Sequence, residues 1–450
     1  ALAKSLEENQ DALNSKTAYS KDSDQEPTVI IADIDPAPKK VEVPENTNTE
    51  LASLIEATIE SNPEIAIARA QEDDAEIAIG IANANYHPQI DLTLTRGREN
   101  TYSKTTTQLN VDRREANIIL NQTLIDFGGR KNSVARRDAL YESAKLRRKD
   151  VTEKVALEIT EAYMGFLKQV SLTNIAKKNV KSHKEMAKLV KLSEQGGNAT
   201  IADVKRVETR LDSANSAKLN SEDALKDTIT AFKRLTGISP YNVKKPKKIV
   251  PKVRKSIKEQ WRNVASKNPK LLSLEADRLS LEKQLKQQKA KLLPEIYGTV
   301  EANYKDNVGG ETGVARDVRG MLGVRVRLYD GGARLGAAQQ IEARILEADA
   351  RHLKLHRELT ENLENNNQEL QSSKKKSSFL GSSFKAAKKV MALYKQQFKA
   401  GTRTPFELLD AQRDLFKAEQ DVINHRYDTA LANYRDLRLR GKLVENLKSL

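Results

Sequence analysis

Leu124-Ile125-Asp126-Phe127-Gly128-Gly129-Arg130 recurs 204 positions later as Leu328-Tyr329-Asp330-Gly331-Gly332-Ala333-Arg334. Other landmarks repeat with nearly the same offset. Asn62-Pro63 and Pro88 return after 206 positions as Asn268-Pro269 and Pro294, and Gly197-Asn198-Ala199-Thr200 returns after 204 as Gly401-Thr402-Arg403-Thr404. Similarity at a fixed offset is the sequence signature of internal repeats. The sequence therefore predicts two tandem copies of one unit, each roughly 205 residues long.

Each copy begins with a pattern of two helices. Apolar residues fall at helical spacing at Leu51, Leu54 and Ile55 in the first copy, and at Trp261 and Val264 in the second. An Asn-Pro pair interrupts this pattern, because proline ends one helix and is well tolerated in the first turn of the next. The second helix of each copy is expected to end at the following proline.

The hydrophobic period then changes from 3.6 to 2, which predicts strands. Ile90, Leu92 and Leu94 alternate with polar residues, and the same alternation follows in three more segments. The predicted strands cover about 89–98, 115–124, 295–304 and 318–328. Each is about 10 residues long, which is close to the 9–11 residues with which a tilted strand crosses a bilayer.

Two interpretations of these strands remain open on alternation alone. They are either hairpins with one wet face on a soluble core, or hairpins that cross a membrane. The surrounding sequence favours the membrane, because it reads as long helices that offer little for the hairpins to pack on. Four strands cannot close a barrel, and open edges are not viable in lipid. Several copies would then have to share one barrel, and three copies would supply twelve strands.

A very long helix is predicted after each hairpin. From Ala333 to about Phe398 it would be roughly 100 Å long at 1.5 Å per residue. Its apolar residues at 4-3 spacing, such as Ile341, Leu355 and Leu359, predict a coiled-coil seam. Glycines near residues 197 and 401 end the long helices, and a return helix follows each of them.

Composition excludes several classes of protein. The 450 residues include no cysteine, so a disulfide scaffold, a cysteine–zinc site and a lipoprotein anchor are not expected. The net charge is +15, but the basic residues are spread along the chain, and the cluster around Pro246 has no interleaved aromatic residues. A nucleic-acid partner is therefore not expected.

The chain divides into four expected parts. Residues 1–46 form an acidic arm that we expect to be disordered, 47–240 the first repeat, 241–255 a basic linker and 256–445 the second repeat. Proline, serine and carboxylates in the arm are typical of segments that cannot bury a core. We expect that an export signal has already been removed from the chain.

The landmarks resemble those of the TolC family of outer-membrane export ducts over about residues 47–445. The motifs are Asn-Pro before each first strand, Asp-x-Gly-x-Arg after each second strand and the tip segment Gly401–Ala411. The resemblance implies a mostly α fold with a β membrane part. A trimer would form a twelve-stranded outer-membrane barrel that continues into a long periplasmic barrel of coiled-coil helices.

The resemblance also assigns roles to residues near the predicted tips. Glu407 and Asp410 match an acidic pair that lines the narrow mouth, and their i, i+3 spacing places them on one helix side. Arg403 and Asp203 match residues that latch neighbouring coiled coils, although Ala202 and Phe398 replace two hydroxyl-bearing residues of that latch. The positions that match the adaptor-docking turns are Gly197, Asn198, Gly401 and Thr402.

The implied partners are a homotrimer, a periplasmic adaptor, an inner-membrane transporter and outer-membrane lipid. The segment from Thr404 to Phe416 is most similar to members that serve type I secretion of proteins such as large adhesins, which favours an ABC-type transporter. Multidrug efflux with an RND-type transporter is the alternative cargo route. A soluble coiled-coil scaffold is the alternative from another class.

No enzyme, cofactor or metal site is expected. His352 and His356 are four residues apart on a predicted helix, but no adjacent glutamate completes a zincin motif. No nucleophile elbow, phosphate loop or dinucleotide fingerprint occurs. The Asp-x-Gly turns at Asp126 and Asp330 lie at strand-to-helix junctions, which favours a conformational role over phosphate binding.

Overall fold

The computed structural model describes residues 50–103, 106–240, 243–244, 246 and 256–448. The predicted arm at 1–46 lies outside the described residues, and so does most of the predicted linker at 241–255. Residues 43–450 form one unit, and the description below concerns that unit alone. Among the described residues, no helix combines the length and the apolar character that crossing a membrane requires.

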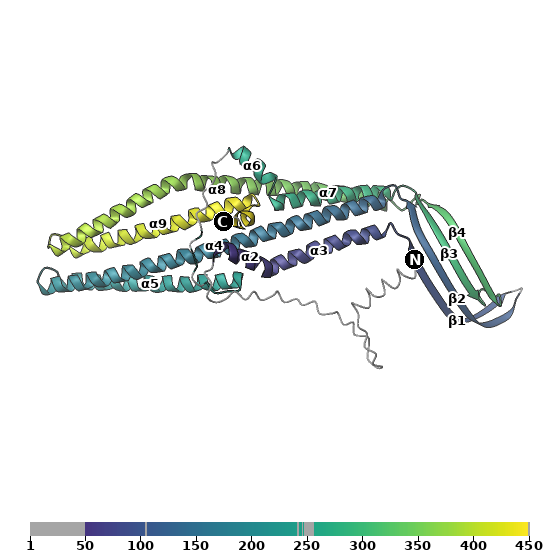
Figure 1. Cartoon of the computed structure of the whole chain (residues 1–450), viewed down its shortest axis with the longest axis horizontal. Coiled ribbons are helices and arrows are strands. Elements are labelled where there is room, and N and C mark those ends of the chain that lie inside the picture. Colours follow the sequence, from purple (N-terminus) through teal and green to yellow (C-terminus); the bar gives the residue numbers. More distant parts are fainter. Residues whose placement is uncertain (1–49, 104–105, 241–242, 245, 247–255, 449–450) are drawn as a thin grey trace. The chain divides into compact units, whose positions relative to one another are not determined.

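The same order of elements occurs in both halves of the chain (Figure 1). The first half contains α2 (Leu51–Ser61), α3 (Pro63–Ala84), β1 (Gln89–Ser103), β2 (Thr106–Ile125), α4 (Gly129–Gln195) and α5 (Ile201–Thr236). The second contains α6 (Ile257–Ala265), α7 (Pro269–Ala290), β3 (Glu295–Asp306), β4 (Val314–Arg325), α8 (Ala333–Lys399) and α9 (Pro405–Leu439). A short helix, α10 (Leu443–Lys448), follows.

The Asn-Pro pairs start helices α3 and α7 as expected from their chemistry. The Asn62 side chain accepts a hydrogen bond of 2.9 Å from the backbone N–H of Glu64, and Pro63 occupies the first helical turn. Asn268 accepts a bond of 3.0 Å from the N–H of Leu271. These bonds satisfy N–H groups that have no partner within the helix.

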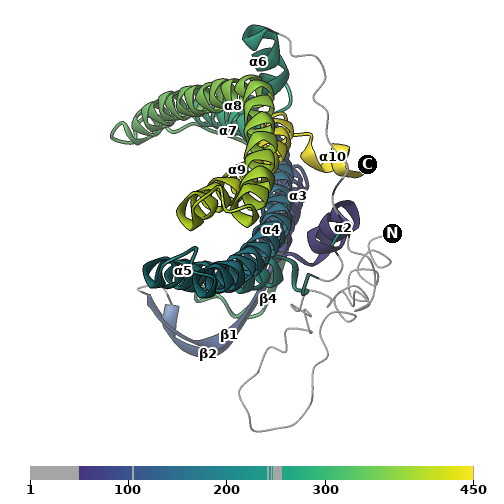
Figure 2. The ribbon, with the colours of Figure 1, turned by 90° about the vertical axis from the view of Figure 1, so that its left-hand side faces the viewer.

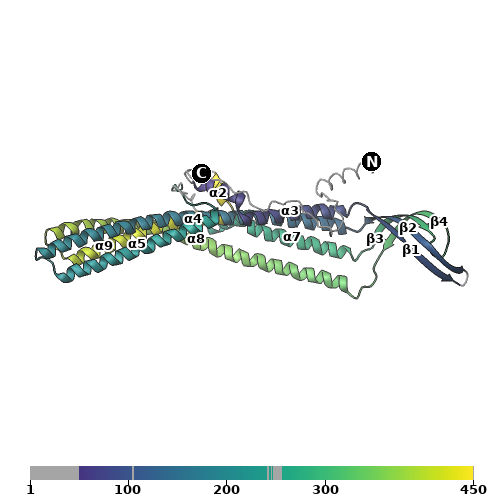
Figure 3. The ribbon, with the colours of Figure 1, turned by 90° about the horizontal axis from the view of Figure 1, so that it is seen from below.

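Helices α3, α4, α5, α7, α8 and α9 form a single curved layer, and α2, α6 and α10 lie outside it (Figures 2 and 3). Near the strands, α4 packs between α3 and α7, and α7 packs on α8. Farther from the strands, α4 packs between α5 and α9, and α9 packs on α8. Helix α8 therefore forms one edge of the layer along its whole length, while α3 and then α5 form the opposite edge.

The largest apolar core lies midway along α4. Val155, Ile159 and Tyr163 of α4 pack there against residues of α2, α9 and α10. Glu153, which is only 3% exposed, accepts hydrogen bonds from the N–H groups of Leu443 and Val444 at 2.9 and 3.3 Å. A buried carboxylate thus satisfies N–H groups at the start of α10 that have no partner within the helix.

The four strands form one antiparallel sheet in the order β1-β2-β3-β4. Leu92, Ile118, Ala302 and Val318 stand side by side in one row across all four strands. Even-numbered positions of this kind form an apolar face, and Leu92, Leu94, Val318 and Leu322 are each more than 60% exposed on it. The odd-numbered positions form a polar face.

Three strands differ from the predicted ranges. β1 and β2 contain 15 and 20 residues, well beyond the ten expected, and β4 covers Val314–Arg325 instead of 318–328. The apolar alternation ends near Leu94 and Ala116, but the backbone ladder continues to the pair Thr101 and Leu109. Backbone hydrogen bonds extend the hairpin there without an apolar face.

The repeated Asp-x-Gly-x-Arg motif joins strand and helix through its arginine. Arg130 donates to the carbonyls of Thr123 at 2.7 Å and Leu124 at 3.0 Å, and pairs with Asp126 at 3.3 Å. In the second half, Arg334 pairs with Asp330 at 2.6 Å and donates to the carbonyl of Lys291 at 2.7 Å. Each arginine ties the start of a long helix to neighbouring carbonyl groups, which is the conformational role predicted for this turn.

We expect Arg130→Met to lower the free energy of unfolding by about 2–3 kcal/mol, because it removes charge-assisted hydrogen bonds to the carbonyls of Thr123 and Leu124. The measurement is urea unfolding of the detergent-purified protein. Arg351→Met is the matched control, since Arg351 forms an exposed i, i+4 pair with Glu347, and such pairs contribute about 0–1 kcal/mol. Equal effects of the two substitutions would contradict this role.

Candidate functional site

The two turns far from the strands share one backbone design. Gly197 and Gly401 adopt left-handed φ values of 73° and 74°. The N–H of the next residue then reaches back into the last helical turn, from Asn198 to the carbonyl of Ser193 at 2.8 Å and from Thr402 to that of Gln397 at 3.0 Å. This is the Schellman arrangement, which satisfies the last carbonyls of a helix. The predicted docking positions are therefore turn residues in both halves.

A capping box starts the return helix after each turn. Thr200 and Asp203 exchange side-chain and backbone hydrogen bonds at the start of α5, and Thr404 and Glu407 do the same at the start of α9. The carboxylates accept from the threonine N–H groups at 3.0 and 3.1 Å. Asp203 and Glu407, predicted as latch and gate residues, thus also cap their own helices.

Hydrogen bonds keep both capping carboxylates ionised. The hydroxyl and N–H of Thr200 lower the pKa of Asp203 from its ordinary value. The backbone N–H of Thr404 lowers the pKa of Glu407, and the Arg403 guanidinium adds to this effect. A lowered carboxyl pKa means that the negative charge persists as pH falls through the ordinary value of 4.5 for glutamate.

Arg403 is held within its own turn. It pairs with Glu407, donates to Gln397 Oε1 at 2.9 Å and lies 4.4 Å from the centre of the Tyr394 ring. Within one chain its carboxylate partner is therefore Glu407, while Asp203 bonds to Thr200. The Arg403–Asp203 latch was expected between neighbouring coiled coils, and it stays a prediction.

Asp410 lies three residues beyond Glu407 on α9 and pairs with Arg413 at 3.2 Å. The side chains of Glu407 and Asp410 are 36% and 33% exposed, so both carboxylates are accessible to water and ions. Phe398, which replaces a hydroxyl-bearing residue of the implied latch, is buried to 9% exposure.

The ends of the two helical hairpins pack on each other, which the sequence did not predict. Met186 and Val190 of α4 meet Phe398, Leu408 and Leu409 of the second hairpin in one apolar cluster. Polar contacts flank this cluster. Lys395 pairs with Glu185 at 3.0 Å, Gln412 donates to Asn179 at 2.9 Å, and the Arg206 guanidinium lies 5.2 Å from the Phe406 ring centre.

The polar face of the sheet carries a hydrogen-bonded network of charged residues. Glu301 accepts from Asn117 at 3.1 Å and from Asn303 at 3.0 Å. Asn303 also donates to Asp317 at 3.2 Å, and Arg319 pairs with Asp317 at 2.9 Å. The period of 2 predicted a polar face but not which residues pair across it.

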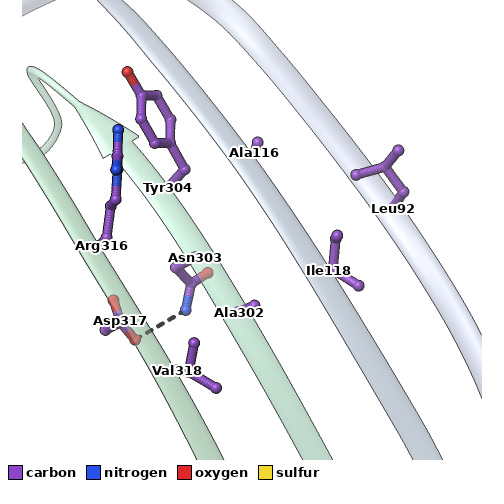
Figure 4. A pocket seen from close by; sticks show the side chains of 9 residues that line it. All are labelled: Leu92, Ala116, Ile118, Ala302, Asn303, Tyr304, Arg316, Asp317 and Val318. Carbon is purple, nitrogen blue, oxygen red and sulfur yellow. Dashed lines mark hydrogen bonds between the residues drawn. The ribbon is translucent and has the colours of Figure 1, made fainter.

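The opposite face of the same strands is shallowly hollowed (Figure 4). The hollow measures about 380 Å³, and small side chains at Ala116 and Ala302 leave room between Leu92, Ile118 and Val318. Asn303 and Asp317 at its border are bonded to each other. The hollow offers no converging polar groups of the kind that fix a small polar ligand.

The two histidines singled out in the sequence have separate neighbours. His352 lies 3.4 Å from Glu275, whereas the His356 ring lies against Trp261 with centroids 4.2 Å apart and the ring planes tilted by 60°. In the part of the chain that the structure describes, no group of three or more His, Cys, Asp or Glu residues is placed to hold a metal ion.

Comparison with known proteins places this architecture in one family. The family model described as "Outer membrane efflux protein" matches residues 54–238 and 262–438. The outer membrane efflux protein BepC of Brucella suis is 20% identical over 369 residues, covering 81% of this chain and 79% of BepC. The alkaline protease secretion protein AprF of Pseudomonas aeruginosa is 24% identical over 402 residues, covering 84% and 82%.

A solved structure confirms the fold. The outer membrane protein VceC of Vibrio cholerae superposes with a TM-score of 0.77 at 14% identity, over 87% of this chain and 96% of that one.

We expect Gly401→Ala to destabilise the second tip by about 1–2 kcal/mol, because a Cβ disfavours the left-handed conformation. Gly336→Ala is the control. Gly336 is exposed within α8 with open space around it, so alanine there raises stability by about 0.5–1 kcal/mol. Thermal unfolding followed by circular dichroism measures both. A change of the same sign in the two variants would refute the assigned turn geometry.

Proposed function

The chain belongs to the outer membrane efflux protein family, and from this premise we propose that it is an export channel of the bacterial outer membrane that extends into the periplasm. The observation that carries the proposal is the sheet. It combines an exposed apolar face, a polar face with paired charges and two strand edges, β1 and β4, that pair with no other described strand.

Lipid accounts for the apolar face, and copies of the chain account for the edges. Unpaired strand edges are not viable in lipid, because their N–H and C=O groups would have no partners. Pairing β4 of one copy with β1 of the next removes every edge. Three copies give a twelve-stranded barrel with its polar face around an aqueous lumen.

The helical layer supports the same closure. Ile77 and Ile81 on α3, at one edge, are 65% and 67% exposed. At the other edge, Leu346 and Phe379 on α8 are 70% and 72% exposed. Exposed apolar rows on opposite edges favour a ring in which α8 of one copy contacts α3 and α5 of the next. Repeats of one ancestral unit then supply six similar segments around a trimer.

The narrow end of this ring is proposed to be the gate. Three copies would place six carboxylates, from Glu407 and Asp410, around one opening. Such a ring favours cations and binds multivalent ones. The capping role of Glu407 supports the proposal, since it holds a charged group in the first turn of α9, directly after the tip turn at Gly401.

For partners, we propose a periplasmic adaptor that docks at the turns of Gly197, Asn198, Gly401 and Thr402, and an inner-membrane transporter that drives export. Protein secretion through an ABC-type transporter is favoured by the tip sequence and by the similarity to a protein named for alkaline protease secretion. Small-molecule efflux with an RND-type transporter is the alternative, favoured by the similarity to BepC. The channel itself is proposed to be passive, without enzyme activity or cofactor.

In planar lipid bilayers we expect discrete cation-selective currents that a trivalent cation blocks from one side. Glu407→Gln with Asp410→Asn raises the blocking concentration roughly tenfold or more, because each lost charge contributes about 1 kcal/mol at close range. Block of the wild type is expected to persist at pH 4.5, the ordinary pKa of glutamate, since hydrogen bonds lower the pKa of Glu407. Asp227→Asn, an exposed carboxylate on α5, should leave block unchanged. Unaltered block in the double variant would contradict the proposed gate of Glu407 and Asp410.

Cysteine cross-linking tests whether the copies form a closed ring. The 450 residues contain no cysteine, so only introduced thiols can react. Ile77→Cys with Leu346→Cys places thiols on opposite edges of the layer. A flexible bis-maleimide is expected to link copies into dimers and trimers on denaturing gels and into nothing larger. Each single variant serves as a control that forms no trimers. Ladders beyond the trimer, or monomers alone, would contradict a closed ring of three.

A further inference from the structure

Five lysines lie in two adjacent rows on the far half of α4. Lys177, Lys184 and Lys191 are spaced by seven residues, and Lys181 and Lys188 form the neighbouring row. All five are exposed. At 1.5 Å per residue the rows extend for roughly 20 Å toward the turn at Gly197. We call these five residues the lysine stripe.

Among the described residues, few carboxylates pair with the stripe. Lys177 has a carboxylate partner, Glu222 of α5, at 3.5 Å. No ion pair is described for the other four. The nearby Glu185 pairs with Lys395 of α8 at 3.0 Å, while the charges of Lys181 and Lys188 also help to lower the pKa of Glu185. Like charges three and four residues apart on a helix repel. Among the described residues, the fold therefore carries a surface with more positive charge than its neighbouring carboxylates balance.

Comparison of the two halves shows that the coiled coil itself does not require these lysines. The residues 204 positions later on α8 include Gly381 and Ala392 in place of Lys177 and Lys188. The other counterparts are Lys385, Lys388 and Lys395, and the last of these is paired with Glu185. A complete stripe occurs on α4 alone.

The stripe continues a line on α4 that already binds other segments. Tyr163 lies 14 residues, or two heptads, before Lys177, so both occupy the same side of the coiled coil. Tyr163 is fully buried there and donates to the carbonyl of Lys244 at 2.5 Å. Helices α2 and α10 contact α4 in the same apolar core as Tyr163, and Figure 2 shows both on the convex side of the curved layer. Farther along this line, the five lysines are exposed in the part of the chain that the structure describes.

We propose that the lysine stripe docks a partner helix that carries carboxylates at the same 4-3 spacing, as part of the adaptor assembly. Charge complementarity argues for an acidic occupant, and the straight 4-3 rows argue for a helix. Leu192, 65% exposed at the tip end of the stripe, supplies an apolar contact for the end of that helix. This inference rests on the proposed function, because it presumes a duct that a partner approaches from outside.

The test uses a defined probe on the detergent-purified full chain. A fluorescent helical peptide with glutamates at 4-3-4-3 spacing is compared with a scrambled peptide of the same composition. We expect the striped peptide to bind about tenfold more tightly, since exposed ion pairs are individually weak but several act together. Added salt is expected to remove this preference.

Two triple variants decide whether position or mere charge matters. K181Q/K184Q/K188Q should lose the preference for the striped peptide. K374Q/K375Q/K376Q removes the same charge from three exposed consecutive lysines of α8 and should keep it. Equal binding of the two peptides, or equal losses in the two variants, would overturn the proposal. The single-channel conductance of K181Q/K184Q/K188Q is expected to match the wild type. If conductance is normal but the peptide preference is absent in the wild type, the docking proposal fails while the channel proposal stands.

Discussion

Every strand edge in a lipid environment must find a partner, and this constraint organises the molecule. One chain supplies four strands whose outer edges, β1 and β4, pair with no other described strand. In the proposed channel, closure by other copies would arrange the helices that continue from those strands in a ring as well. Arg130, in the first turn of α4, donates to carbonyl groups of β2. Arg334, in the first turn of α8, donates to the carbonyl of Arg327, just beyond the end of β4. Each arginine thus connects the start of a long helix to the chain that leads out of the sheet.

The order of the elements could be predicted from sequence because its signals are local and occur twice. Asn62, Gly197 and Asp126 each mark a cap, a turn or a junction through their own backbone chemistry, and each has a counterpart in the second half. Strand lengths were predicted less well, since the ladder between β1 and β2 continues after the apolar alternation has ended. Backbone hydrogen bonding leaves no mark in side-chain periodicity.

Some contacts at the tips of the helical hairpins could not be predicted from the sequence alone. The capping boxes of Thr200 and Thr404 could have been inferred from the acidic residue three positions later. The contact between Met186 and Phe398 could not, because it joins residues more than 200 positions apart without any local signal. The choice of Glu407 as the partner of Arg403 is similarly a matter of geometry, since several carboxylates lie nearby in sequence.

The conformation of both tip turns is fixed by their backbone and by the capping residues. It therefore depends little on the other side chains that the turns expose. Gly197 and Gly401 satisfy the last carbonyls of one helix, and the threonine boxes satisfy the first N–H groups of the next. The position between them holds alanine at 199 and arginine at 403 on nearly identical backbones. The residue at this position can therefore differ while the backbone of the turn stays the same, so the surface that the two tips present can vary without a change in their shape.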